Sequence, residues 1–271
     1  MFEILIQEMK LRNFSSKTID VYLYYNKEFL QFCQKSPRDI SHKDIRIYLL
    51  HLITRQYSSS TINLAHNALN FYYGKILQKS VDRISFQKKE QRIKQIASVD
   101  EIQRMHFALK NPKHKLILSL LYATGVRVSE LVCIKIKDID LERKLLCVRQ
   151  GKGKKDRYTI LSNAVIDEMK NYLRTRPDKS PYLFASSGGH ISPRTVEEVI
   201  TQACTEAQIQ KKITPHSLRH SFATHHMEAG TKTEYIQQML GHTDIRTTRG
   251  YEQIVTSHLE KIKSPHDNFI I

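Results

Sequence analysis

Apolar residues recur at nearly helical spacing through the first 77 residues, and no segment there alternates with the two-residue period of a strand. Serines at 15–16, at 41 and at 58–60 each precede an apolar face, and serine is a preferred helix cap. A further short helix is expected at about 2–9. Four short helices can share one apolar core, so the pattern predicts a helical N-terminal domain at 1–77.

A second helical region begins at Ser98, which forms a predicted capping box with Glu101. Residues 145–149 and 157–161 interrupt it, because they alternate with period 2 around a turn rich in glycine and lysine and so predict an antiparallel hairpin. The fold class is therefore mainly α with a small antiparallel β-sheet. The expected helices lie at about 100–109, 113–124, 128–135, 163–175, 194–207, 216–229, 232–240 and 244–254.

Residues 78–97 differ from the regions on either side. They hold six basic residues against two acidic ones and show weak periodicity, so we interpret them as an interdomain linker. Lys88 and Lys89 in this linker are candidates for contact with a phosphate backbone, and a merely solvated linker is the alternative.

The charge balance narrows the choice of partner. The 271 residues include 43 Lys and Arg against 27 Asp and Glu, a formal net charge of +16, which favours DNA, RNA or an acidic membrane surface. The longest apolar stretch, residues 116–126, is far shorter than the roughly 20 residues that span a bilayer, and the N-terminus lacks the basic start of a signal peptide. The membrane option is therefore the weaker one, and we expect a cytoplasmic, nucleoid-associated protein.

The four cysteines indicate neither a zinc site nor a disulfide framework. Cys33, Cys133, Cys147 and Cys204 form no C-x-x-C pair, and four are too few to crosslink a chain of this length. Reduced core thiols are the simpler interpretation, and neither a metal nor a cofactor is expected.

Residues 216–220, HSLRH, bring His216 and Arg219 to one helix face, because they are three residues apart. His216 and His220 would also suit a metal at i and i+4. However, Ser217 stands where zinc proteases carry a glutamate, and the sequence offers no evident third ligand. Packing of His220 is the remaining alternative.

Residues 240–242, LGH, predict a helix end at Gly241 and a new segment from His242, nine residues before Tyr251. A lone tyrosine is usually a core or surface residue, so Tyr251 carries little information by itself.

Two further motifs lie earlier in the second region. In residues 123–131, ATGVRVSEL, a break at Gly125 precedes a helix that carries Arg127 and, one turn later, Glu130. An ordinary helix joint with an Arg–Glu pair would explain that pattern equally well. In residues 151–157, GKGKKDR, Lys152 sits between two glycines at the hairpin tip, where a solubilising loop is the alternative.

In this order and with these spacings, the four motifs resemble the tyrosine recombinase (integrase) family, especially its Xer-type members. The resemblance is close over residues 123–157 and 214–251, and residues 15–33 resemble the family's core-binding domain. It implies a SAM-like core-binding domain at 1–77, a catalytic domain at 98–255, and a tail at 256–271 that contacts a neighbouring protomer or packs in cis.

The resemblance also implies a reaction. Tyr251 would attack a phosphodiester of duplex DNA to give a 3′-phosphotyrosyl bond and a free 5′-hydroxyl, without metal or ATP. Arg127 and Arg219 would grip the phosphate oxygens, since each guanidinium binds two oxygens in one plane.

The remaining roles follow from the same resemblance. His216 matches the general base, Lys152 the general acid and His242 a donor to the phosphate. Glu130 would orient His216 or Arg127 by hydrogen bonding to it, without touching the phosphate itself. The hairpin residues Lys154, Lys155 and Arg157 would contact the surrounding DNA backbone.

Two features depart from the family. Gly250 precedes Tyr251 where the family more often has a bulkier residue, and glycine loosens a helix. The linker also lacks the expected prolines.

The expected function is site-specific recombination at short inverted half-sites, in a tetramer of one protein or of two related ones. Chromosome dimer resolution and recombination of mobile elements are both open. The alternatives are relaxation of DNA like a type IB topoisomerase, which the HSLRH and LGH motifs disfavour, and a non-catalytic DNA-binding relative, which six filled active positions disfavour.

Overall fold

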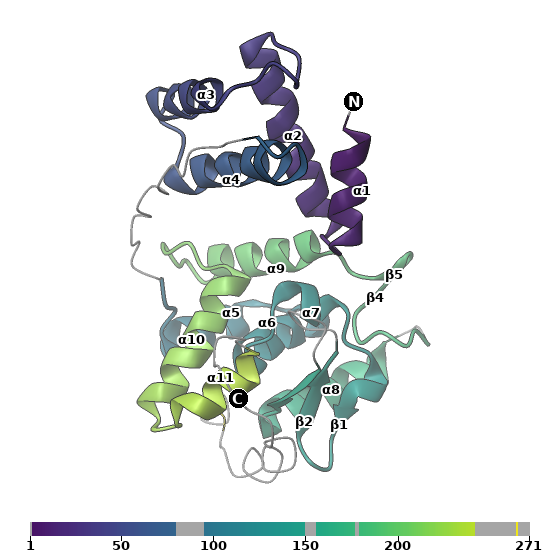
Figure 1. Cartoon of the computed structure of the whole chain (residues 1–271). Helices are drawn as coiled ribbons and strands as arrows, with labels where there is room; N and C mark the ends of the chain where they lie inside the picture. Colours follow the sequence, from purple (N-terminus) through teal and green to yellow (C-terminus); the bar gives the residue numbers. More distant parts are fainter. Residues whose placement is uncertain (1, 80–94, 150–155, 177–178, 242–263, 265–271) are drawn as a thin grey trace. The chain divides into compact units, whose positions relative to one another are not determined.

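The computed structural model describes residues 2–79, 95–149, 156–176, 179–241 and 264. The chain forms two compact units, Met1–Arg92 and Ile93–Ile271, and each is described by itself (Figure 1). Both are mainly helical and the second also contains small antiparallel sheets, which confirms the predicted fold class.

The described residues of the N-terminal unit form four α-helices followed by a π-helical stretch. The side chains of Ser15, Ser41 and Ser58 cap α2, α3 and α4, and each accepts a hydrogen bond from the backbone N–H three residues further on. The predicted starts of these helices are therefore confirmed. The elements are α1 Glu3–Leu11, α2 Ser16–Cys33, α3 His42–Thr54, α4 Ser59–Leu69 and η1 Asn70–Ile76.

Aromatic side chains fill the core of this unit. Phe29 and Tyr73 are fully buried and pack edge to face with their ring centroids 5.5 Å apart. Lys79, one of the six basic residues counted in the linker, binds back into the same unit. Its Nζ donates to the carbonyl oxygens of Arg38, at 2.5 Å, and Ile40, at 2.8 Å.

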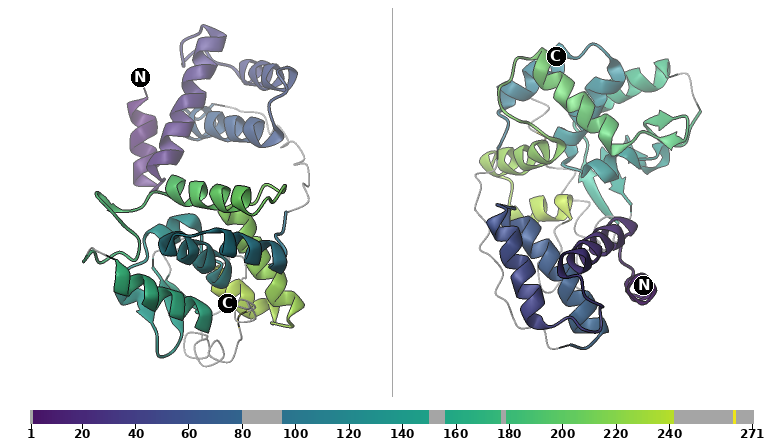
Figure 2. Two further views of the ribbon diagram at one scale, coloured as in Figure 1. Left: turned by 180° about the vertical axis from the view of Figure 1, so that it is seen from behind. Right: turned by 90° about the horizontal axis from the view of Figure 1, so that it is seen from above.

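The second unit is built around α6, in which every residue from Leu116 to Thr124 is buried. A helix that is buried on all sides belongs in the interior of a domain. The helices α8 and α10 pack against it (Figure 1 and Figure 2). The helical elements are α5 Val99–Ala108, α6 Pro112–Thr124, α7 Val128–Val132, η2 Ile136–Asp138, α8 Asn163–Thr175, α9 Pro193–Glu206, α10 Pro215–Glu228 and α11 Thr233–Leu240.

The helix expected at 128–135 ends earlier than predicted, at Val132. The following backbone is used for a different contact, because Lys135 is extended and pairs with Tyr182 in an isolated antiparallel bridge. The N–H of Ile136 also donates to the carbonyl of Pro181. Pairing with this distant segment satisfies backbone groups that a longer helix would have used.

The predicted hairpin belongs to a three-stranded antiparallel sheet of order β1-β2-β3. Strands β2, Leu145–Val148, and β3, Arg157–Ile160, pair with Val148 opposite Arg157. The sequence did not predict β1, Ile139–Asp140, or a second hairpin of β4, Ala185–Ser186, and β5, Gly189–His190. Two-residue strands are too short to show an alternating pattern.

A small apolar cluster joins this sheet to the last two described helices. It contains Leu145 and Ile160 from the hairpin, Phe222 from α10, and Ile236, Met239 and Leu240 from α11. The C-terminal end of α11 is therefore held against the base of the hairpin.

The helix expected at 244–254 and nearly all of the tail at 256–271 lie outside the described residues, as do the residues between 80 and 94. Within the described part of the chain, no helix is both long and apolar enough to cross a membrane.

Gly125 ends α6 in the left-handed conformation, with φ +61°, as the sequence predicts for this break. A Cβ at this position would lie 2.5 Å from Cδ1 of Phe222 and 2.9 Å from Cδ2 of Leu240. Both the backbone conformation and the close packing therefore require glycine here.

We expect Gly125→Ala to lower the free energy of unfolding by about 2–4 kcal/mol, because it adds left-handed strain to overpacking. The measurement is urea unfolding followed by circular dichroism. Gly188→Ala is the matched control, since nothing lies within 4 Å of its added Cβ. Equal stability of the two variants would contradict this account of the joint.

Candidate active site

Arg127 and Glu130 meet at the start of α7. Arg127 is the residue before the helix, and Glu130 reaches back to it with both carboxylate oxygens. Oε2 accepts the backbone N–H of Arg127 at 2.7 Å, and Oε1 accepts its Nη1 at 2.8 Å. Of the two roles expected for Glu130, this geometry supports the orientation of Arg127.

Arg157 binds the same carboxylate from β3. Its Nη1 donates to Oε1 of Glu130 at 2.9 Å and its Nη2 to Oε2 at 2.7 Å, a two-pronged pair between a side chain that is 10% exposed and one that is 6% exposed. Its Nε donates to the carbonyl of Met239 at 2.7 Å. All three nitrogens of Arg157 therefore have protein partners, and the contact with the DNA backbone that the sequence predicts for Arg157 stays a prediction.

Arg219 enters the site from α10, which begins at Pro215 behind a Thr214 cap. The side chain is buried, and it donates Nη1 to the carbonyl of Gly125 at 2.5 Å and Nη2 to that of Leu240 at 2.6 Å. A guanidinium has five N–H donors, so these two bonds orient the group and leave others for a ligand.

The three arginines share one electrostatic environment. Burial is the main cause that lowers the pKa of Arg219 to about 10; the positive charges of Arg127 and Arg157 act in the same direction, and Glu130 opposes them. Burial alone would raise the pKa of Glu130, but the hydrogen bonds from Arg157 and Arg127 hold it at about 2. Three guanidinium groups around one carboxylate leave an excess of positive charge that suits an oxyanion such as a phosphate.

His216 is exposed at the start of α10. Its Nε2 lies 2.9 Å from Nε2 of His220, so one ring donates to the other. No group of three or more metal-binding side chains occurs among the residues that the structure describes. The geometry therefore gives the His216–His220 pair no third ligand within that part of the chain.

The other predicted site residues lie outside the described residues: Lys88, Lys89, Lys152, Lys154, Lys155, His242 and Tyr251. The residues directly before His242 and those flanking the segment with Lys152 are described. Gly241 ends α11 with φ +64°, as predicted, directly before His242. Arg149 and Arg157 stand on either side of the segment that contains Lys152.

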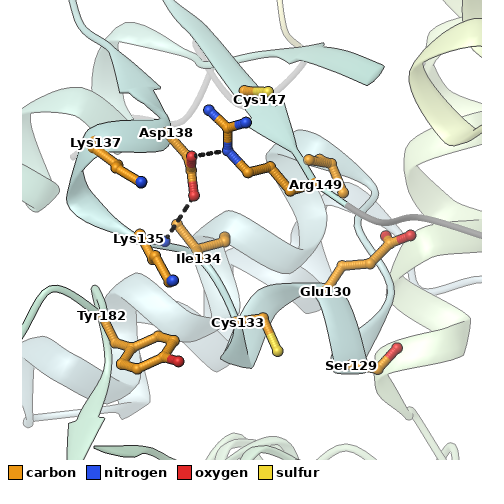
Figure 3. Close-up of a pocket in the computed structure, with 11 residues that line it drawn as sticks. Ser129, Glu130, Cys133, Ile134, Lys135, Lys137, Asp138, Cys147, Arg149 and Tyr182 are labelled. Carbon is orange, nitrogen blue, oxygen red and sulfur yellow. Dashed lines mark hydrogen bonds and ion pairs between the residues drawn. The ribbon is translucent and has the colours of Figure 1, made fainter. Parts of the chain in front are cut away.

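A cavity of about 470 Å³ lies beside Glu130, between the end of α7, η2 and β2 (Figure 3). Lys135, Lys137 and Arg149 line it, and Nε of Arg149 donates to the buried Oδ1 of Asp138 at 2.5 Å. Arg149, the last described residue before Lys152, is thus anchored by an ion pair, and the cavity wall carries three basic side chains against the two carboxylates of Glu130 and Asp138.

The sequence analysis expected Arg157 to contact DNA because it follows a basic loop. It did not predict the protein partners of Arg157 or the backbone carbonyls that accept hydrogen bonds from Arg157 and Arg219. One sequence signal was available. In the predicted hairpin, Arg157 and Thr159 share a face of β3, and they pair with Val148 and Leu146, which are both buried. An arginine on that face needs an internal partner.

The comparisons with known proteins cover almost the whole chain. The profile described as "Phage integrase family" matches residues 90–258, and "Phage integrase, N-terminal SAM-like domain" matches residues 1–83. Tyrosine recombinase XerA of Pyrococcus furiosus is 37% identical over 260 residues, which cover 93% of this chain and 89% of that protein. Tyrosine recombinase XerC of Anoxybacillus flavithermus is 28% identical over 276 residues, which cover 93% and 91%.

Two solved structures extend the comparison. The crystal structure of XerA recombinase is 32% identical with a TM-score of 0.53, and the match covers 93% of this chain and 95% of that one. XerH site-specific recombinase bound to difH substrate in a pre-cleavage complex is 20% identical with a TM-score of 0.70, covering 91% and 80%. At that identity, the likeness to XerH bears on the fold alone.

Glu130→Gln tests the charge of the carboxylate at the centre of the site through the pH dependence of the protein's stability. The pKa is about 2 in the folded chain against an ordinary 4.5, so the pairing contributes its full stability above pH 4.5 and loses it as the pH falls toward 2. That contribution is on the order of 3 kcal/mol. We expect the deficit of the variant in thermal unfolding to be large at pH 7 and to narrow by pH 3.

Glu198→Gln is the control, because Glu198 pairs with Arg194 on an exposed face and such pairs contribute little. A Glu130→Gln deficit of constant size from pH 7 to pH 3 would contradict the proposed charge pairing.

Proposed function

The chain belongs to the phage integrase family as an Xer-type tyrosine recombinase, and from this premise we propose that it cuts and rejoins duplex DNA through a covalent bond to Tyr251. The observation that carries the proposal is the group of Arg127, Arg157 and Arg219 around Glu130. It concentrates positive charge where a phosphate in the transition state would gain negative charge.

In the proposed reaction, Arg127 and Arg219 bind the non-bridging oxygens of the scissile phosphate. The Tyr251 hydroxyl attacks phosphorus as His216 takes its proton, and the bond from phosphorus to the 5′-oxygen breaks. Lys152 gives that oxygen its proton, and His242 donates to the phosphate. Attack by the 5′-hydroxyl of a second strand reverses these steps and restores the tyrosine, so the bond energy is kept.

The partner in this proposal is duplex DNA, engaged by a multimeric assembly. XerH bound to difH, and a lambda integrase dimer bound to a COC′ core site, are among the solved structures with this fold. The proposal adds that residues 1–77 and the basic residues Lys88, Lys89, Lys154 and Lys155 bind DNA beside the cleavage point. It further adds a tetramer on paired inverted half-sites, with residues 256–271 in contact with a neighbouring protomer.

The test uses a pool of duplexes with random inverted half-sites and a nick near the centre, so that a cleaved strand cannot be resealed. The wild-type chain is expected to form a protein–DNA adduct that survives a denaturing gel, and Tyr251→Phe is expected to form none while it still binds DNA. Tyr24→Phe, at an exposed position in the N-terminal unit, is the matched control. An adduct of undiminished yield with Tyr251→Phe would show that another residue is the nucleophile.

The same assay separates the alternatives. Adducts spread evenly over sequences, together with relaxation of supercoiled plasmid, would favour a topoisomerase. Binding without any adduct would favour a non-catalytic DNA-binding protein. Arg127→Ala is expected to slow adduct formation roughly 100-fold, since hydrogen bonds to charged groups contribute about 1.5–3 kcal/mol each.

We expect adduct formation to continue in excess EDTA, because two guanidinium groups supply the charge stabilisation that a metal supplies in many nucleases. The measurement is the single-turnover rate with and without the chelator. A rate that falls tenfold or more in EDTA and returns with Mg²⁺ would contradict this chemistry.

A further inference from the structure

Arg157 connects three parts of the second unit that are far apart in sequence. It is the first residue of β3, just after the segment that contains Lys152. Its two Nη groups hold Glu130 in α7, at 2.9 and 2.7 Å, and its Nε holds the carbonyl of Met239 near the end of α11, at 2.7 Å.

The end of α11 is shaped around this side chain. A Cβ on Gly241 would lie 2.8 Å from Cδ and 3.1 Å from Nε of Arg157, so the backbone of Gly241 packs directly on the arginine. The next residue in the chain is His242. The two preceding backbone carbonyls also accept hydrogen bonds from arginines, that of Met239 from Arg157 and that of Leu240 from Arg219.

The carboxylate of Glu130 links Arg157 to Arg127. Each oxygen of Glu130 accepts one bond from Arg157 and one from Arg127, so the position of one arginine fixes the other through a rigid, buried group. The Arg157 side chain is only 10% exposed, whereas that of Arg127 is 29% exposed. Arg127 is therefore the member of this pair that is open to a ligand.

We propose that Arg157 is a positioning residue for DNA cleavage: it holds Glu130, and through it Arg127, in place without contacting DNA. This inference rests on the proposed function. It replaces the role expected from the sequence, in which Arg157 contacts the DNA backbone.

Lysine at this position would keep the charge but lose the geometry. An ammonium group cannot bind both oxygens of Glu130 in one plane and also reach the carbonyl of Met239 as the guanidinium does. Arg157→Lys therefore tests the hydrogen-bond geometry of this side chain without removing its positive charge. Arg194→Lys is the matched control, because Arg194 also pairs with a glutamate in the same unit but lies on an exposed face.

The first measurement compares cleavage with binding on the nicked duplex. Arg157→Lys is expected to slow single-turnover adduct formation roughly 30- to 100-fold while the Kd and its salt dependence stay within twofold of those of the wild type. The loss of a phosphate contact would instead weaken binding to all sequences and reduce the salt slope by about 1. That result would overturn the proposal.

The second measurement uses a duplex with a methylphosphonate at the scissile position. This group lacks the negative charge that Arg127 would bind, so a defect that acts through Arg127 should shrink. We expect the factor by which Arg157→Lys slows adduct formation to be at least fivefold smaller on this duplex than on the phosphodiester duplex. A merely structural defect would slow both duplexes by the same factor, and that outcome would also overturn the proposal.

If Arg157→Lys does not fold, Glu130→Asp disturbs the same paired contact from the other side and is subject to the same two measurements. Wild-type protein that forms no adduct with any duplex would overturn the proposed function and this role with it. Wild-type protein that cleaves, with an Arg157→Lys variant that cleaves equally fast, would overturn the role of Arg157 alone.

Discussion

The carboxylate of Glu130 is the contact on which the site depends. Its oxygens accept hydrogen bonds from the guanidinium groups of Arg127 and Arg157 at N···O distances of 2.7–2.9 Å. Its negative charge also offsets the repulsion between these two arginines and Arg219. One carboxylate cannot neutralise three guanidinium groups, so the site keeps an excess of positive charge in the free protein. Burial of that charge lowers the pKa of Arg219, and a bound phosphate would relieve the repulsion.

The backbone arrangement around this contact depends on two glycines. Gly125 and Gly241 end α6 and α11 in the left-handed conformation, and each lies too close to a neighbouring side chain to carry a Cβ. These two helix ends present the carbonyls of Gly125, Met239 and Leu240 to the buried arginines. The positions of the arginines are thus set by helix ends as well as by their own charges.

Local signals were sufficient to predict much of this structure. The caps at Ser15, Ser41, Ser58 and Ser98 and the break at Gly125 depend on neighbouring residues alone, and the structure has them. The partners of Arg157 depend on contacts 27 and 82 residues away in the sequence, which no local pattern contains. The roles of Lys152, His242 and Tyr251 stay predictions, because these residues lie outside the described part of the chain.

The central claim is that the arginine network exists before DNA binds, and hydrogen exchange of the arginine side chains in the DNA-free protein tests it most directly. With ¹⁵N-labelled arginine, the Nε–H of Arg157 should exchange far more slowly than that of Arg194. Both are hydrogen-bonded, but the bond from Arg157 to the carbonyl of Met239 is buried, whereas the bond from Arg194 to Glu198 lies on an exposed face. The slow signal should disappear in Arg157→Lys. Equally fast exchange at Arg157 and Arg194 would show that the network is not formed in the free protein, and would contradict the account.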